Sequence, residues 1–101
     1  MAGGPSYAGK PRPAVIIQDD RFDTDSVTVC PFTTDPVEAP LFRVEVDPSN
    51  SNGLHTPCRL VVDKITSLPR SRLGNLVGVL DDADVMRLNR AIVVFLGIAG
   101  P

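Results

Sequence analysis

Apolar and polar residues are spaced along this chain in a way that predicts five strands and one helix. Short runs rich in valine, isoleucine and leucine are separated by clusters of proline, glycine, asparagine and aspartate, which is typical of strands joined by turns. The expected strands are residues 13–18, 26–32, 41–46, 58–65 and 76–80. Between residues 84 and 96 the apolar positions instead recur at helical spacing, at Val85, Leu88, Ile92 and Phe95, with Gly97 as a stop signal.

The pattern also assigns faces to the strands. Residues 41–46 alternate strictly, with Arg43 and Glu45 on the polar side, which predicts a half-buried antiparallel strand. The strand before it also alternates and places Cys30 on its wetter face. Residues 1–9 are rich in glycine and poor in apolar residues, so we expect a loop there. The pattern as a whole predicts a mainly β (α+β) domain that ends in one helix.

Composition limits what such a domain can be. The chain has 101 residues, enough for one hydrophobic core but not for two, so we expect a single domain over residues 1–101. Its net charge of −2 lacks the strong positive charge of a general nucleic-acid-binding domain, so any such site must be a local patch. We find no secretory signal and no apolar stretch of transmembrane length, and we therefore expect a soluble, cytoplasmic protein.

Cysteine and histidine give no sign of a metal site. Cys30 and Cys58 are the two cysteines, and we expect a buried free thiol at each, because nothing in the sequence indicates an oxidising compartment. His55 is the single histidine, and no neighbouring cysteine or carboxylate has the spacing of a zinc site. The sequence therefore predicts no metal and no cofactor, and it gives His55 no role.

Candidate chemistry begins at Arg12, which lies between Pro11 and Pro13. The two prolines favour a stiff, extended backbone and so hold the guanidinium in a defined place. The second candidate is the hydroxyl pair Thr33 and Thr34, at the end of an expected strand. Each has an ordinary alternative, because a surface arginine can be merely solvated and hydroxyls at strand ends often bind the backbone of a turn.

These segments resemble the MazF/PemK toxins of bacterial toxin–antitoxin pairs. The resemblance rests on residues 9–18 (GKPRPAVIIQ) and 27–34 (VTVCPFTT), and it continues through 62–65 (VDKI), 80–82 (LDD) and 96–97 (LG). It covers nearly the whole chain. It implies an SH3-like antiparallel β-barrel with a C-terminal helix, which forms a homodimer. It also implies an endoribonuclease, or mRNA interferase, that needs no metal and is inhibited by an antitoxin laid into its RNA groove.

The resemblance also implies roles for individual residues. Arg12 would stabilise negative charge on the scissile phosphate, and Thr33 would bind that phosphate or orient the ribose 2′-hydroxyl as it attacks. Such an attack on single-stranded RNA gives a 2′,3′-cyclic phosphate and a 5′-hydroxyl end, and it would spare DNA. Further contacts with RNA would come from Lys10, Thr34, Asp63 and Tyr7.

Several of these residues have simpler interpretations. Asp63 could form a salt bridge at a sheet edge, and Tyr7 could be an ordinary loop residue. Further candidate phosphate contacts are the arginines of the middle of the chain, for which a solvated face is the simpler alternative: Arg59, Arg70 and Arg72.

Two departures from the family pattern leave other functions open. The usual lead-in, an Arg-Gly-Asp-type segment and a full apolar strand, is missing, so either the start lies upstream or this form is an inactive homologue that only binds antitoxin. Val61 stands where some relatives carry an arginine, so we expect no second arginine from this strand.

The other alternative is a non-catalytic, CcdB-like toxin that binds gyrase through a Trp-Gly-Ile-like tail. The absence of tryptophan argues against it.

Overall fold

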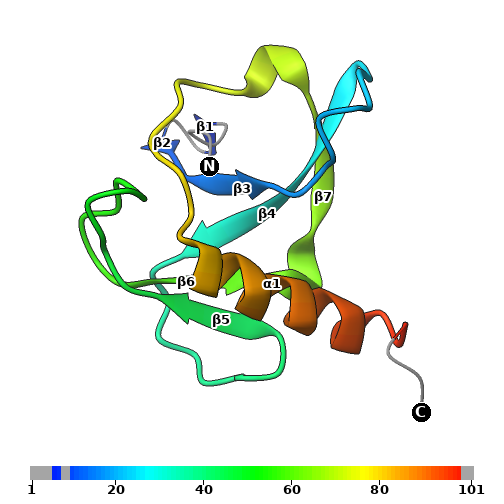
Figure 1. The fold of residues 1–101 in the computed structure, drawn as a ribbon. Coiled ribbons are helices and arrows are strands. Elements are labelled where there is room, and N and C mark those ends of the chain that lie inside the picture. Colours follow the sequence, from blue (N-terminus) through cyan, green and yellow to red (C-terminus); the bar gives the residue numbers. More distant parts are fainter. Residues whose placement is uncertain (1–5, 8–9, 99–101) are drawn as a thin grey trace.

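The computed structural model describes residues 6–7 and 10–98. Along the chain the strands are β1 (Ser6–Tyr7), β2 (Lys10–Pro11), β3 (Ala14–Ile16), β4 (Ser26–Thr33), β5 (Arg43–Val46), β6 (Cys58–Val61) and β7 (Thr66–Pro69). The α-helix is α1 (Asp82–Phe95), and short 3₁₀ helices span Val62–Lys64 and Arg70–Arg72. The expected class, mainly β with one helix at the end of the chain, is confirmed (Figure 1).

β4 is the centre of the main sheet, in which all pairings are antiparallel. β3 pairs with one edge of β4, while β7 and then β6 pair along the other, and β5 pairs with β6. Val29 shows this arrangement, because it is the register partner of both Ile16 and Thr66. No ladder joins β5 to β3 among the described residues, so the expected barrel is an open, curled sheet there.

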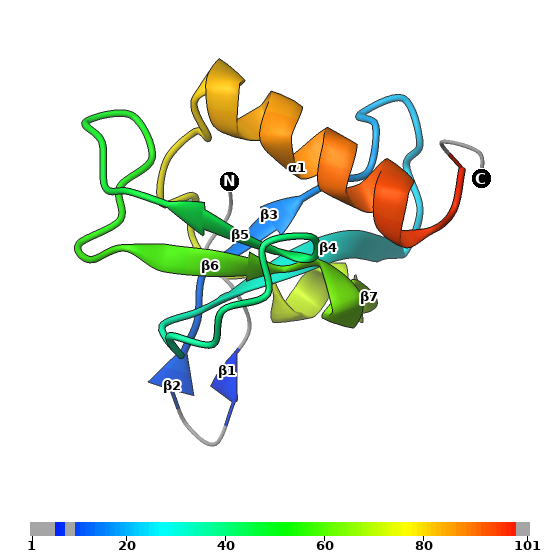
Figure 2. The same ribbon diagram turned by 90° about the horizontal axis from the view of Figure 1, so that it is seen from below.

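Both faces of β4 are buried, against two different cores. Cys30 and Phe32 belong to the larger core, which lies between the sheet and α1 and includes Leu60 and Leu88. On the opposite face of β4, Val27 and Val29 form a small second core with Ala14, closed by Leu68 and Leu73. Figure 2 shows α1 over one face of the sheet, with the β1–β2 hairpin projecting on the other side.

The helix follows its predicted register and ends as expected. It begins at Asp82, two residues earlier than predicted, with Asp81 at the N-cap, and it buries Leu88 and Ala91 against the sheet. At the other end Gly97 has a φ of +73°, and Gly97 and Ile98 donate backbone hydrogen bonds to the carbonyls of Val94 and Val93. These bonds form a Schellman motif, which satisfies carbonyls that the helix end would otherwise leave unpaired.

Four details of the sequence prediction are wrong. Ser6–Tyr7 pairs with Lys10–Pro11 as a short hairpin, where a loop was expected. The face of β4 that carries Cys30 was expected to be the wetter one, but it is covered by the larger core beneath α1. The expected strand 58–65 breaks after Val61 into a 3₁₀ helix and then β7.

The expected strand 76–80 is not a strand, since within it only Leu76 forms an isolated bridge. The chain there is held against the turn before β6 instead, where Val79 donates a hydrogen bond to the carbonyl of Ser51. Gly78 allows this close approach, because a Cβ at that position would lie 2.5 Å from the Ser51 oxygen.

Candidate active site

A cleft of ≈ 460 Å³ lies where β3, β4 and β6 meet, and it is lined by both residues predicted to be catalytic. Arg12 comes from the segment just before β3, and Thr33 is the last residue of β4. The floor is apolar, with Pro31 and Val61 on the sheet face that turns away from the larger core. The remaining lining residues are Phe32, Asp35, Arg43, Lys64 and Thr66.

The pairing of β3 with β4 explains why Arg12 and Thr33 meet. Ala14 is the register partner of Pro31, and Pro13 accepts a hydrogen bond from the amide of Phe32 at 3.1 Å. Continuing this antiparallel register by two residues places Arg12 opposite Thr33. The guanidinium is exposed at the cleft, and its backbone is confined by a proline on each side.

The Thr33 hydroxyl has one structural partner. Its Oγ1 accepts a hydrogen bond from the backbone amide of Asp35 at 3.1 Å, the turn-supporting contact that the sequence offered as the ordinary alternative. A hydroxyl can accept and donate at the same time, so its proton remains available to a ligand in the cleft. Thr34 is exposed and does not line the cleft.

Asp63 forms the salt bridge that was its alternative interpretation. Its carboxylate lies 3.1 Å from Nε of Arg43 and 3.5 Å from Nη2 of the same side chain. Arg43 itself lines the cleft, and it was missed by the sequence prediction. The alternation of 41–46 placed Arg43 on the polar face of its strand, but only the pairing of β5 with β6 brings it beside Val61 at the cleft.

Two further residues of the cleft lining, Lys64 and Thr66, were also missed by the sequence prediction. The side chains of Tyr7 and Lys10 lie outside the described part of the structure, although their backbones pair in the β1–β2 hairpin.

Arg59 does not line the cleft, although it is the register partner of Thr33 and its Nη1 donates to the carbonyl of Asp35 at 3.5 Å. It pairs with Glu38 at 2.9 Å and with Glu45 at 3.0 Å, so its guanidinium is already occupied by two carboxylates.

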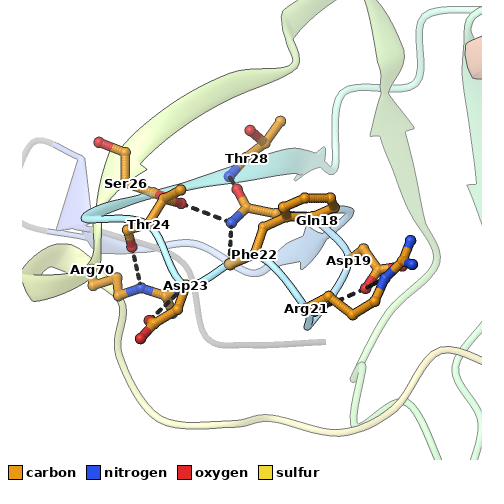
Figure 3. Close-up of polar contacts among 9 residues, drawn as sticks. All are labelled: Gln18, Asp19, Arg21, Phe22, Asp23, Thr24, Ser26, Thr28 and Arg70. Carbon is orange, nitrogen blue, oxygen red and sulfur yellow. Dashed lines mark hydrogen bonds and ion pairs between the residues drawn. The ribbon is translucent and has the colours of Figure 1, made fainter.

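Arg70 belongs to a different polar cluster, around the loop between β3 and β4 (Figure 3). Its Nε donates a hydrogen bond to the carbonyl of Thr24 at 2.6 Å. Gln18 bridges the loop, donating to Phe22 and Thr24 and accepting from the amide of Thr28. None of these residues lines the cleft, so the cluster shapes the loop rather than the candidate site.

Three other polar residues, Asp19, Arg72 and His55, do not line the cleft. In the loop of Figure 3, Asp19 accepts hydrogen bonds from the backbone and side chain of Arg21, which lower the pKa of its carboxyl. Arg72 is exposed in the second 3₁₀ helix, and His55 is exposed in the turn before β6.

The cysteines are free and buried, as expected. Burial raises the pKa of the Cys30 thiol to about 12, and the nearby Asp63 carboxylate acts in the same direction, partly offset by a hydrogen bond with the backbone of Val61. A thiol with such a pKa is neutral and unreactive, so Cys30 is a core residue.

In residues 6–7 and 10–98, no group of three or more His, Cys, Asp or Glu side chains is placed to hold a metal ion. Within the same part of the chain, no helix is long and apolar enough to cross a membrane.

Comparison with known proteins identifies the family. Over 96 residues the chain is 55% identical to a probable endoribonuclease MazF of Mycolicibacterium smegmatis, covering 94% of this chain and 88% of the relative. The toxin MazF-mt6 of Mycobacterium tuberculosis superposes with a TM-score of 0.78 at 28% identity, over 95% of this chain and 96% of that one.

A mycobacterial endoribonuclease solved with its cognate antitoxin shares the fold, with a TM-score of 0.78 at 22% identity over 99% and 94% of the two chains. Residues 2–96 match the family described as the PemK-like, MazF-like toxin of type II toxin–antitoxin systems, and the chain belongs to this family.

Proposed function

We propose that this chain is an endoribonuclease toxin that cleaves single-stranded RNA at the cleft containing Arg12 and Thr33. Its family and its 55% identity to a protein named as a probable endoribonuclease support the activity. The observation that carries the assignment of the site is that Arg12, just before β3, and Thr33, at the end of β4, line one cleft and lie opposite each other when the β3–β4 register is continued by two residues.

The proposed reaction is a transesterification within the RNA. The 2′-oxygen attacks the adjacent phosphorus while the bond from phosphorus to the 5′-oxygen breaks, which leaves a 2′,3′-cyclic phosphate and a 5′-hydroxyl end. The proton of the 2′-hydroxyl passes to water or to the Asp35 carboxylate at the cleft wall, and the departing 5′-oxygen takes a proton from water. The nucleophile belongs to the substrate, so the protein needs only to position the strand and to stabilise charge.

Arg12 and Thr33 suit this task because both can donate hydrogen bonds to phosphate oxygens. A guanidinium offers a planar pair of N–H donors to the non-bridging oxygens, where negative charge grows in the transition state. Arginine carries a permanent positive charge in proteins, so electrostatic stabilisation is the proposed role of Arg12. The Thr33 hydroxyl donates a hydrogen bond to the same phosphate or to the 2′-oxygen.

The partners follow from the same proposal. We place the RNA and the inhibitory segment of an antitoxin in one groove, with Lys10, Tyr7, Thr34 and Asp63 as further contacts around it. A homodimer is supported by apolar side chains left exposed at the end of α1 and after it: Val93, Val94, Phe95, Leu96 and Ile98. A toxin that acts on RNA works in the cytoplasm, which is the compartment we propose. No observation favours a gyrase-binding function.

Substitution of Arg12 tests the assignment. Arg12→Ala should slow cleavage of a single-stranded RNA pool roughly a hundredfold or more, because it removes a charged donor from the transition state. Arg21→Ala is the matched control, since Arg21 is also an exposed arginine but lies outside the cleft. Single-turnover rates and analysis of the product ends measure the effect. Equal rates for Arg12→Ala and the parent would remove Arg12 from the mechanism.

A further inference from the structure

Arg43 is a second arginine in the cleft that contains Arg12 and Thr33. It opens strand β5, where it is the register partner of Val61 in β6. β6 therefore offers an apolar side chain at this point of the cleft, and β5 offers a cation beside it. The side chain of Arg43 is only 15% exposed, so its guanidinium is held in place rather than swinging in solvent.

Asp63 holds the Arg43 guanidinium in place. Its two carboxylate oxygens lie 3.1 Å from Nε and 3.5 Å from Nη2 of Arg43, in a side-on arrangement. This contact engages one edge of the guanidinium and leaves the donors of Nη1 uncommitted. A fixed arginine loses less conformational freedom when it binds a ligand, which makes it a better anion site than a solvated one.

Arg59 shows what a purely structural arginine looks like in this sheet. Its side chain is buried to the same degree, 16% exposed, but it is shared between Glu38 and Glu45 and does not line the cleft. Arg43 has a single carboxylate partner and a place in the cleft wall. The two neighbours thus differ in whether donors remain for a ligand.

We propose that Arg43 binds a backbone phosphate of the RNA in this cleft and that Asp63 is its positioning residue. This inference rests on the proposed function. It gives Asp63 an indirect role through Arg43 in place of a direct contact with RNA, because the Asp63 carboxylate is engaged by Arg43. RNA held by Arg12, Thr33 and Arg43 would cross the cleft floor formed by Pro31 and Val61.

The main alternative is that the Arg43–Asp63 pair has a purely structural role and only joins β5 to the first 3₁₀ helix, Val62–Lys64. Arg43 also lines a second groove, against α1, together with Arg87 and Arg90. Arg90→Ala is therefore a matched control, since it removes the same charge from the groove that does not contain Arg12. Melting temperatures of all variants show whether a loss of binding is a loss of folding.

The experiment measures binding of a random single-stranded RNA pool with 2′-O-methyl riboses, which cannot be cleaved, at several salt concentrations. Arg43→Ala should weaken binding about tenfold and lower the slope of log affinity against log salt by about 0.7, the value for one phosphate contact on a single strand. Arg43→Lys should keep the slope but not the full affinity, because it retains charge and loses the planar fork. Arg90→Ala should match the parent.

A double variant separates contact from repulsion. Arg43→Ala alone leaves the Asp63 carboxylate without its partner near the RNA, whereas Arg43→Ala with Asp63→Asn removes both charges. If Arg43 binds phosphate, the double variant stays weak. If it returns to the affinity of the parent, or if Arg43→Ala binds like the parent from the start, the inference is overturned.

The outcome for the parent protein distinguishes the two proposals. A parent that cleaves unmodified RNA, with an Arg43→Ala variant that binds and cleaves equally well, overturns the role of Arg43 alone. A parent that neither binds the modified pool nor cleaves unmodified RNA overturns the proposed function, and the role of Arg43 with it. Should Arg43→Ala fail to fold, Arg43→Gln serves instead, since its amide can still donate to Asp63 while the charge is gone.

Discussion

Leu60 and Val61 are neighbours in β6, yet they belong to different regions of the molecule. Leu60 is fully buried in the core beneath α1, while Val61 points to the opposite face and forms part of the cleft floor. Successive side chains of a strand point to opposite faces, so one short strand serves both regions. The core side is apolar and tightly packed, whereas the cleft side gathers Arg12, Thr33 and Arg43.

In β6, stability and activity should therefore be separable by residue parity. Side chains under α1 should set the free energy of unfolding with little direct effect on RNA. Side chains in the cleft should set the rate of cleavage with little effect on unfolding.

Leu60→Ala should have the largest effect on stability. Removing a fully buried leucine costs the transfer free energy of its methyl groups and leaves a cavity, about 3 kcal/mol in all. Leu76→Ala is the control, because Leu76 is 71% exposed. Urea unfolding followed by circular dichroism measures both. Folded Leu60→Ala should still cleave RNA, and a lost activity in fully folded protein would break the separation.

Asn52→Ala should have the next largest effect and lower the free energy of unfolding by about 2 kcal/mol. Asn52 is a buried polar side chain, and each of its polar atoms has a hydrogen-bond partner. Its Nδ2 donates to the carbonyl of Asp47, and its Oδ1 accepts from the amides of Ser49 and Leu54. Asn50→Ala, in the same turn but exposed, is the matched control. Equal unfolding midpoints for the two variants would show that the buried network contributes no stability.

Cys30 predicts a dependence of stability on pH. Its pKa is about 12 in the folded chain, against 9.0 for a free thiol, so the unfolded chain loses the proton first. The stabilisation is complete below about pH 9 and is lost as pH rises towards 12, at roughly 1.4 kcal/mol per pH unit. The difference in unfolding free energy between the parent and Cys30→Ala should shrink by that slope above pH 9. A constant difference would contradict the raised pKa.

Much of the fold could be predicted from the sequence because its signals are local. Apolar residues three and four positions apart predicted the helix, and apolar runs and alternation predicted β3, β4 and β5. The segment 76–80 was predicted to be a strand because Leu76, Val77 and Val79 are apolar. It packs instead against the turn at Ser51, a close approach that Gly78 allows, and forms no ladder. Local composition cannot reveal which partner a segment finds.

The residues of the candidate site could likewise be predicted only where their signals are local. Arg12 was found because two prolines mark it, and Thr33 because it ends a strand. Arg43 was missed, because it reaches the cleft only through the pairing of β5 with β6 and its contact with Asp63, twenty residues away in the chain. Cys30 was placed on a wetter face because alternation in β4 cannot show that both faces are covered.

The claim that Arg12 and Thr33 act on the same phosphate is tested most directly by a double-mutant cycle. Single-turnover cleavage of one RNA would be measured for the parent, Arg12→Ala, Thr33→Val and the double variant. Two groups that share one transition-state charge are not independent, so the double variant should lose clearly less than the product of the two single losses. A double variant whose loss equals that product would contradict a shared phosphate.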